Sequence, residues 1–358
     1  MKRLDWYIIK KFLGTFFYAI LILAVISCVI DYSEKVDAFV SRKAPLAAIL
    51  NYYKDFIPHI TALLFPLFVF IATIFFTSKI AYKSEIIAIL ASGVSFQRFL
   101  RPYAIGGSFL CILSLIANHW VIPNANKQRL AFENRYVNSA QIVSDRNVHL
   151  KLSKNLYVYV QSYDYSTNMG FHFTAETING VNMQEKLFAD RVSYDSIKKI
   201  WHLYNVVIRY NDGLKEKMTF LPEEYVKYPS FTPKDLDEDE DIKEALTTPE
   251  LLRYIAKEKL RGRETLNFYY VEKDRRTAQP FAAFILVIIG ACIASRKIRG
   301  GSGLHLALGI LISALYIMLL QFSTTFSTKA GLNPLIAVWI PNLIFGYVAF
   351  VLYRRQVK

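Results

Sequence analysis

The chain has 358 residues, of which 53% are apolar and 15% aromatic, and its mean hydropathy is positive. These values fit membrane helices combined with a polar region better than a single soluble core. Much of the net charge of +14 lies at the ends of apolar runs, so we expect no nucleic acid partner. All three cysteines fall inside apolar segments, which excludes a disulfide framework or a CxxC metal site in the polar part.

Six segments have the length and apolarity of membrane helices. They cover residues 12–31, 56–77, 100–122, 280–295, 304–326 and 335–353. The first is longer than the core of a signal peptide and has no small-x-small cleavage site before Asp31, so we expect a retained anchor. The segments therefore form two groups of three, separated by a long polar insert.

The lysines and arginines near the ends of these segments predict their orientation. If the N-terminus is cytoplasmic, the inside segments carry fourteen basic residues and the short outside loops carry five. The positive-inside rule then places both termini in the cytoplasm and the insert, residues 124–276, on the far side of the membrane.

The insert alternates apolar or aromatic residues with polar ones in stretches such as NLYVYVQSYDY and IWHLYNVVIRY, which predicts a β-sandwich or barrel. Seven acids follow within residues 235–244. We interpret this run as a solvated linker, with binding of a cation or a basic partner as the alternative. A helix that carries Pro249 near its start is expected next.

The chain lacks a GxxxxGK[ST] phosphate loop, an HExxH motif and a GxSxG nucleophile elbow. We therefore expect no catalytic residues, no metal, no cofactor and no ATP hydrolysis by this chain alone. The six histidines are scattered without ligand spacing. His59 and His119 lie closest to the interior of a span, where an ionisable group can mark a transport pathway, although packed histidines are the commoner case.

The stretch SEIIAILASGVS, residues 84–95, lies between two spans and predicts a short helix. Twelve helical residues reach about 18 Å, which is too short for a bilayer core of about 30 Å. Ser84 can cap its start, Glu85 suits its positive end, and Gly93 can adopt the left-handed turn that ends it. Its apolar surface fits either docking on another protein or an amphipathic connector on the lipid surface. That surface comprises Ile86, Ile87, Ile89 and Leu90.

Several motifs, in their order and spacing, resemble those of the LptF/LptG (YjgP/YjgQ-type) lipopolysaccharide export permeases over nearly the whole chain. They are SExxxxxASGxS from Ser84, HWVIP at 119–123, FAD..SYD....W.L.NV from Phe188 to Val206, ELLRYI at 250–255, RRTAQPFA with Gln279 and Pro280, and WIPN at 339–342. The first two motifs are more similar to the G-type than to the F-type permease.

The resemblance implies an α-helical polytopic membrane protein with six transmembrane helices (3+3) and an inserted periplasmic β-jellyroll domain. The expected domains are residues 1–123 with a coupling helix at 84–95, residues 124–245 with the β-jellyroll and the acidic linker, the linking helix at 246–276, and residues 277–358. The expected location is the inner membrane of a Gram-negative bacterium.

The resemblance also implies partners and a role for the short helix. Its partners would be an LptB-like ATPase dimer, a sibling six-span permease of LptF-like or LptG-like type, and LptC-like and LptA-like periplasmic proteins. The substrate would be lipopolysaccharide, extracted from the inner membrane. The expected ATPase-coupling residues are Ser84, Glu85, Ile86, Ile87, Ile89, Leu90 and Gly93.

Such a lipid requires a wide apolar cavity with cations near its outer rim. The candidate lipid-binding residues are Lys35, Arg42, Lys43 and Lys54 at the rim, and Phe16, Phe65, Phe68, Tyr316 and Phe322 in the spans. Most of these aromatic residues would also suit plain helix packing. Asp31 stands where some relatives carry a lysine, which weakens the phosphate assignment and leaves Lys35 as a substitute.

Two other functions are compatible with these residues. One is the permease of a different ABC exporter that moves a lipoprotein or a peptide. The other is a membrane-embedded transferase that acts on a lipid carrier. Its only obvious acidic set would be Asp31, Glu34 and Asp37, which lack a partner motif.

Overall fold

The computed structural model describes residues 3–137, 144–165, 167–180, 182–212, 215–228, 231–236, 242–261, 266–296 and 302–357. The chain forms two compact units. The first unit contains residues 1–132, 243–251 and 267–358, and the second contains residues 133–242 and 252–266. Each unit has its own hydrophobic core.

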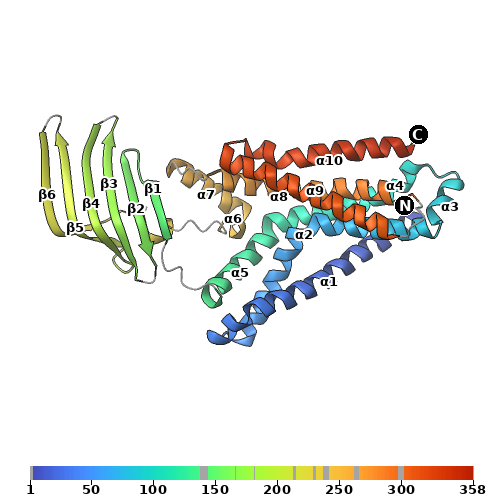
Figure 1. Ribbon diagram of the computed structural model, residues 1–358, viewed down its shortest axis with the longest axis horizontal. Coiled ribbons are helices and arrows are strands. Elements are labelled where there is room, and N and C mark those ends of the chain that lie inside the picture. Colours follow the sequence, from blue (N-terminus) through green and yellow to red (C-terminus); the bar gives the residue numbers. More distant parts are fainter. Residues whose placement is uncertain are drawn as a thin grey trace. The chain divides into compact units, whose positions relative to one another are not determined.

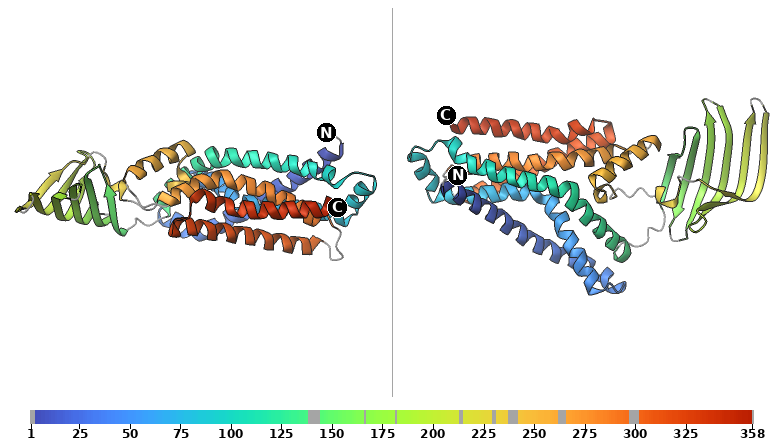
Figure 2. Two further views of the ribbon diagram at one scale, coloured as in Figure 1. Left: turned by 90° about the horizontal axis from the view of Figure 1, so that it is seen from above. Right: turned by 180° about the vertical axis from the view of Figure 1, so that it is seen from behind.

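Six helices in the described residues are long and apolar enough to cross a membrane, which confirms the predicted six spans. They are α1 (Arg3–Ser41), α2 (Leu46–Tyr82), α4 (Phe96–Ile116) with its continuation, α8 (Leu266–Ala294), α9 (Ser302–Ala330) and α10 (Pro334–Val357). The helix α4 continues through a π-helical turn, η1 (Ala117–Val121), into α5 (Ile122–Tyr136). The long helices run alongside one another, and both chain ends lie at the same end of this bundle (Figures 1 and 2).

Each span separates an inner from an outer apolar face, as α1 illustrates. Phe12 and Phe16 are buried in the bundle core, whereas Leu21, Val25 and Val29, spaced by four residues, are exposed. An exposed apolar stripe at helical spacing suits contact with lipid or with another membrane helix. Hydrocarbon offers no water to the backbone, so the helix itself must satisfy its N–H and C=O groups.

Four of the described spans contain a proline, and in three of them a side chain from a neighbouring element donates to a carbonyl that the proline leaves without its helical donor. Proline has no N–H, so the carbonyl four residues earlier loses its helical donor. The Ala62 carbonyl, freed by Pro66 of α2, accepts a hydrogen bond from the Gln279 side-chain amide of α8 at 2.7 Å. The buried Ser323 hydroxyl of α9 likewise donates to the Ala337 carbonyl freed by Pro341.

The third case joins the π-helical turn to α8. Pro280 frees the Arg276 carbonyl, and the buried Asn118 amide lies 3.4 Å from it as donor. Three donors from three different elements thus connect α2 with α8, α8 with η1, and α10 with α9. Gln279 and Pro280 of the RRTAQPFA motif therefore have a structural role at the entry of the fourth span.

In the second unit, six antiparallel strands follow one another in a single sheet in chain order. They are β1 (Ser144–Lys151), β2 (Leu156–Asp164), β3 (Met169–Asn179), β4 (Asn182–Asp195), β5 (Ile200–Asp212) and β6 (Lys215–Val226). An inserted β domain between the third and fourth spans is confirmed. The described strands form one open sheet in meander order, which differs from the two packed sheets or the closed barrel that the alternation predicted (Figure 1).

One face of the sheet carries the core of this unit. Trp201 and Phe173 are fully buried there, and the Trp201 ring stacks on Phe231 with 4.7 Å between centroids. The indole N–H donates to the Phe231 carbonyl at 3.1 Å. Residues 231–236, with the short 3-10 helix η2 (Pro233–Asp235), thus cover this face. Burial raises the pKa of Tyr163 in the same core to about 12, so its hydroxyl stays protonated at neutral pH.

Two short helices precede the fourth span, α6 (Ile242–Ala245) and α7 (Thr248–Arg261). The Glu250 carboxylate accepts hydrogen bonds from the Thr247 N–H at 2.8 Å and from the Thr247 hydroxyl at 2.7 Å. This pairing fixes the start of α7, as in a capping box. The predicted helix is confirmed. Half of the predicted acidic linker, residues 237–241, lies outside the described residues.

The proline repair yields a double-mutant prediction. Gln279→Leu should lower the thermal unfolding temperature in detergent micelles, because an unsatisfied buried carbonyl costs about 1–3 kcal/mol. In a Pro66→Ala background the backbone N–H that the substitution restores can reach the Ala62 carbonyl, so the same change should cost much less. The exposed Gln321→Leu of α9 serves as control. An equal loss from Gln279→Leu in both backgrounds would contradict this assignment.

Candidate functional site

The short helix α3 (Glu85–Ala91) lies at the end of the bundle where both chain ends are found (Figures 1 and 2). It has seven residues, fewer than the expected twelve. The predicted side-chain cap by Ser84 is wrong, since Ser84 adopts a left-handed φ of 62° and forms no side-chain cap hydrogen bond. Backbone reversal at this position prevents the extended geometry that a capping serine needs. The left-handed turn at Gly93 is confirmed, with a φ of +86°.

The four apolar residues of α3 divide between two faces. Ile86 is 1% exposed and belongs to the core cluster that also contains Phe12 of α1 and Phe65 of α2. Ile89 and Leu90 pack against the same cluster. Ile87 is 52% exposed and shares the outer face with Ala88 and Ala91. The inner face therefore fastens α3 to the bundle, and the outer face is available to a partner.

Polar contacts join α1, α4 and α10 near α3. The Arg98 guanidinium of α4 pairs with the buried Asp5 carboxylate of α1 at 2.7 Å. The Gln97 amide of α4 donates to the Tyr353 hydroxyl of α10 at 2.5 Å. Glu85, at the start of α3, is half-buried and lies close to Tyr7 of α1.

At the other end of α1, the candidate rim residue Lys35 is already paired. Its ammonium lies 2.6 Å from the Asp31 carboxylate and donates to the Tyr52 hydroxyl at 2.6 Å. The hydroxyls of Tyr52 and Tyr53 also donate to Asp31, at 3.0 Å and 3.2 Å. Asp31, the departure from the expected lysine, is therefore the centre of a closed cluster.

The other rim candidates differ in exposure. Lys43 and Lys54 are exposed, whereas Arg42 is half-buried. All three lie at the same end of the α1–α2 hairpin as Lys35. The two lysines are therefore accessible to an anionic ligand.

The aromatic candidates are not brought together into one cavity. Phe16 and Phe65 are buried and meet edge to face, with 5.4 Å between ring centroids, and Phe68 packs against the same cluster. Tyr316 is buried elsewhere and donates to the Asn342 side chain at 3.0 Å. Phe322 is exposed on α9.

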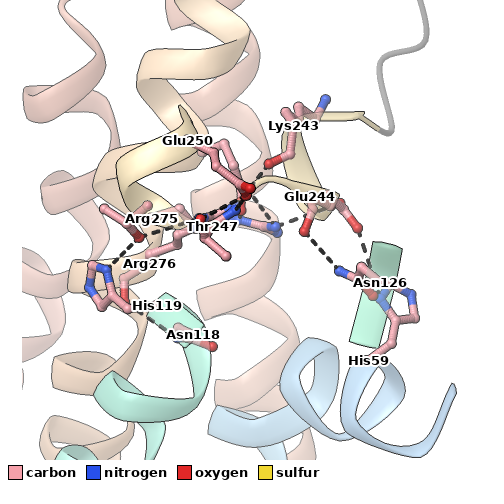
Figure 3. A network of polar contacts seen from close by, with 12 residues as sticks. His59, Asn118, His119, Asn126, Lys243, Glu244, Thr247, Glu250, Arg275 and Arg276 are labelled. Atoms are coloured by element: carbon pink, nitrogen blue, oxygen red, sulfur yellow. Dashed lines mark hydrogen bonds and ion pairs between the residues drawn. The ribbon is translucent and has the colours of Figure 1, made fainter. Parts of the chain in front are cut away.

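A polar network that the sequence did not predict joins α2, the π-helical turn, α6, α7 and α8 (Figure 3). Its centre is the buried pair of Arg276 and Glu272, with the guanidinium Nε 3.0 Å from the carboxylate. The same guanidinium donates to the Lys243 carbonyl at 2.8 Å and lies 3.4 Å from the Thr248 hydroxyl. One buried arginine thus holds both α6 and the start of α7 against the fourth span.

Both notable histidines belong to this network. His119 Nδ1 lies 2.7 Å from the Thr248 hydroxyl, and His59 Nδ1 lies 3.9 Å from a Glu244 oxygen. The Arg275 guanidinium reaches Glu244 at 3.7 Å and Glu272 at 2.7 Å. Figure 3 shows these side chains converging from separate helices. Glu244, the last residue of the acidic run, is therefore part of the helix packing.

The π-helical turn lies beside this network and orients two of its members. An extra residue in the turn lets Asn118 face Arg276 while His119 faces Thr248. Such bulges are frequent at functional sites. The HWVIP and RRTAQPFA motifs contained the signal, but nothing in the sequence indicated that they would meet.

Six membrane-length helices with a β domain inserted between the third and the fourth define a polytopic membrane protein. The chain belongs to the lipopolysaccharide export system permease LptF/LptG family, whose model matches residues 6–355. It is therefore a multi-pass inner membrane subunit of a lipopolysaccharide export complex and a transporter permease by class. No curated protein matches the chain.

Proposed function

We propose that the chain is the membrane subunit of an ATP-driven exporter that extracts lipopolysaccharide from the inner membrane and passes it to a periplasmic β-jellyroll bridge. ATP hydrolysis belongs to an LptB-like dimer that docks on α3. The observation that carries the proposal is the division of α3 into a face packed on the spans and an exposed face around Ile87. Such a helix can transmit force from a docked partner to the bundle.

The family argues against the other two functions. A lipoprotein or peptide exporter would share the α3 arrangement, but the family model names lipopolysaccharide export. A transferase would need its acids available for chemistry, whereas Asp31 is engaged with Lys35 and two tyrosines. The cargo is therefore proposed to be lipopolysaccharide.

The proposed partners follow from the same class. We propose a sibling six-span permease beside this chain and LptC-like and LptA-like proteins that receive the lipid. Exposed apolar side chains along α1 and α9, such as Val29 and Ile310, support a membrane partner for these helices. The G-type identity remains a prediction.

The proposed orientation has both termini in the cytoplasm and the β domain in the periplasm. Two observations support it. The number of spans among the described residues is even, and both termini lie at the same end of the bundle as α3. A single cysteine at the exposed Asn179, in a chain whose three native cysteines are replaced by alanine or serine, should react with a membrane-impermeant maleimide once the outer membrane is permeabilised. A cysteine at the exposed Ser92 should stay unlabelled until the inner membrane is lysed. The reverse labelling pattern would refute the topology.

Docking on α3 predicts that Ile87→Asp strongly weakens ATPase association. A charge in the centre of an apolar contact should reduce copurification of the ATPase by about tenfold or more, with export lost in parallel. The spans should still insert, because Ile87 points away from the core. Leu46→Asp, at an exposed position in the α1–α2 hairpin, is the matched control. Undiminished ATPase association in Ile87→Asp would exclude the docking role.

For the lipid, we propose that Lys43 and Lys54 make the first contacts with phosphates, while Lys35 mainly compensates Asp31. Lys54→Ala should therefore weaken lipopolysaccharide binding without changing thermal stability. Lys35→Ala should instead lower stability by about 3 kcal/mol, because it leaves a buried carboxylate without its cation. The double change Asp31→Asn with Lys35→Met should recover most of that loss. Normal stability of Lys35→Ala with a binding loss as large as that of Lys54→Ala would overturn this division.

A further inference from the structure

A hollow of about 660 Å³ lies on the β domain and is lined by residues of β1 to β4. Its volume falls within the range of roughly 300–1,000 Å³ that is typical of small-molecule sites. Side chains alternate between the two faces of a strand, so His149, Lys151, Tyr157 and Tyr159 lie opposite the buried Val148, Leu150 and Val158. The hollow therefore opens on the face opposite the Trp201 core.

The register of the sheet assembles these side chains into one surface. His149 pairs with Tyr159 across β1 and β2, with 4.6 Å between ring centroids. Lys151 pairs with Tyr157, and its ammonium lies 5.0 Å from that ring centroid. The Tyr159 hydroxyl is fixed by a hydrogen bond to Asn147 at 2.8 Å. Aromatic rings are thus held in place with a cation beside them.

The far side of the hollow adds polar groups from β3 and β4. Thr174 pairs with Tyr159, and Glu176 pairs with Tyr157 on one side and Lys186 on the other. The Lys186 ammonium lies 2.8 Å from the Glu176 carboxylate. The Lys186 side chain is 40% exposed and the Glu176 side chain is 30% exposed. A half-exposed ion pair holds its partners weakly and can exchange with another anion. The lining contains two lysines and one glutamate, which leaves an excess of positive charge.

This combination has a clear ligand chemistry. Tyrosine rings present flat faces to the C–H groups of a sugar, and threonine and glutamate oxygens accept hydrogen bonds from its hydroxyls. Lysine ammonium groups bind phosphate as point charges. An acyl chain would instead need a surface without charges. We propose that this hollow binds a phosphorylated saccharide, and the inference rests on the proposed function in that the exported lipid supplies such a headgroup.

The test uses the full chain in detergent micelles and glucosamine 1-phosphate as the probe, with binding followed by ligand-observed NMR. Lys151→Ala with Lys186→Ala should raise the dissociation constant by about tenfold or more, because two charge-assisted contacts are lost. Tyr159→Ala should also weaken binding. Arginine at both lysine positions should retain it, which separates loss of charge from damage to the sheet. Lys217→Ala, an exposed lysine on β6 at the opposite edge, is the control and should bind as the wild type does.

Two further ligands complete the experiment. Unphosphorylated glucosamine and inorganic phosphate should each bind much more weakly than the sugar phosphate. Phosphate that binds as tightly as the sugar phosphate would overturn the saccharide assignment, and so would equal binding by the Lys217→Ala and hollow variants or no binding by the wild type. The assay needs neither ATPase nor transport, so its result is independent of whether α3 docks an ATPase.

Discussion

In hydrocarbon, a backbone carbonyl that loses its helical donor has no water to replace it, and this constraint determines which helices are neighbours here. Prolines free the carbonyls of Ala62, Arg276 and Ala337. Each accepts a hydrogen bond from a side chain of another element, Gln279, Asn118 and Ser323 respectively. A slip of any of these helices by one turn would leave a carbonyl unsatisfied at a cost of several kcal/mol in lipid. The prolines therefore specify helix register as well as local bends.

The same logic governs charge in the helical unit. Asp5, Asp31 and Glu272 are buried carboxylates, and each lies within 3.0 Å of a cation on Arg98, Lys35 or Arg276. Buried pairs add little net stability, because desolvation offsets the attraction, but separating the partners is costly. Their value here is specificity. Arg276 in particular joins α6 and the start of α7 to the fourth span through the Lys243 carbonyl and the Thr248 hydroxyl.

The sequence was sufficient for the spans and for the β domain, because both depend on local periodicity. Residues 56–77 are apolar enough to identify α2 without any partner, and the alternation in IWHLYNVVIRY identifies β5. The candidate site was less predictable. Phe16 and Phe65 were expected to line a cavity, yet their rings pack edge to face within the core of the bundle.

The Arg276 network could not be predicted from the sequence for a different reason. It includes His59, His119 and Glu244, which are far apart in the chain, and no local sequence pattern shows which helices will meet. Ser84 failed as a cap for a similar reason. Packing of Ile86 into the bundle requires the chain to reverse at that point, and a left-handed Ser84 provides the reversal at some backbone strain.

The core cluster connects the proposed docking surface mechanically to the far end of α1. Ile86 of α3 packs in one cluster with Phe12, Phe65 and Val287, which come from α1, α2 and α8. Close-packed interiors transmit displacement, because they contain few voids that could absorb it. The helix α1 then rises roughly 45 Å between Asp5 and Lys35 at 1.5 Å per residue. A partner that moves α3 would therefore also displace α1, whose far end carries the Asp31–Lys35 cluster. Any rotation of α1 must either move Tyr52 of α2 with it or break the hydrogen bonds of Tyr52 with Lys35 and Asp31.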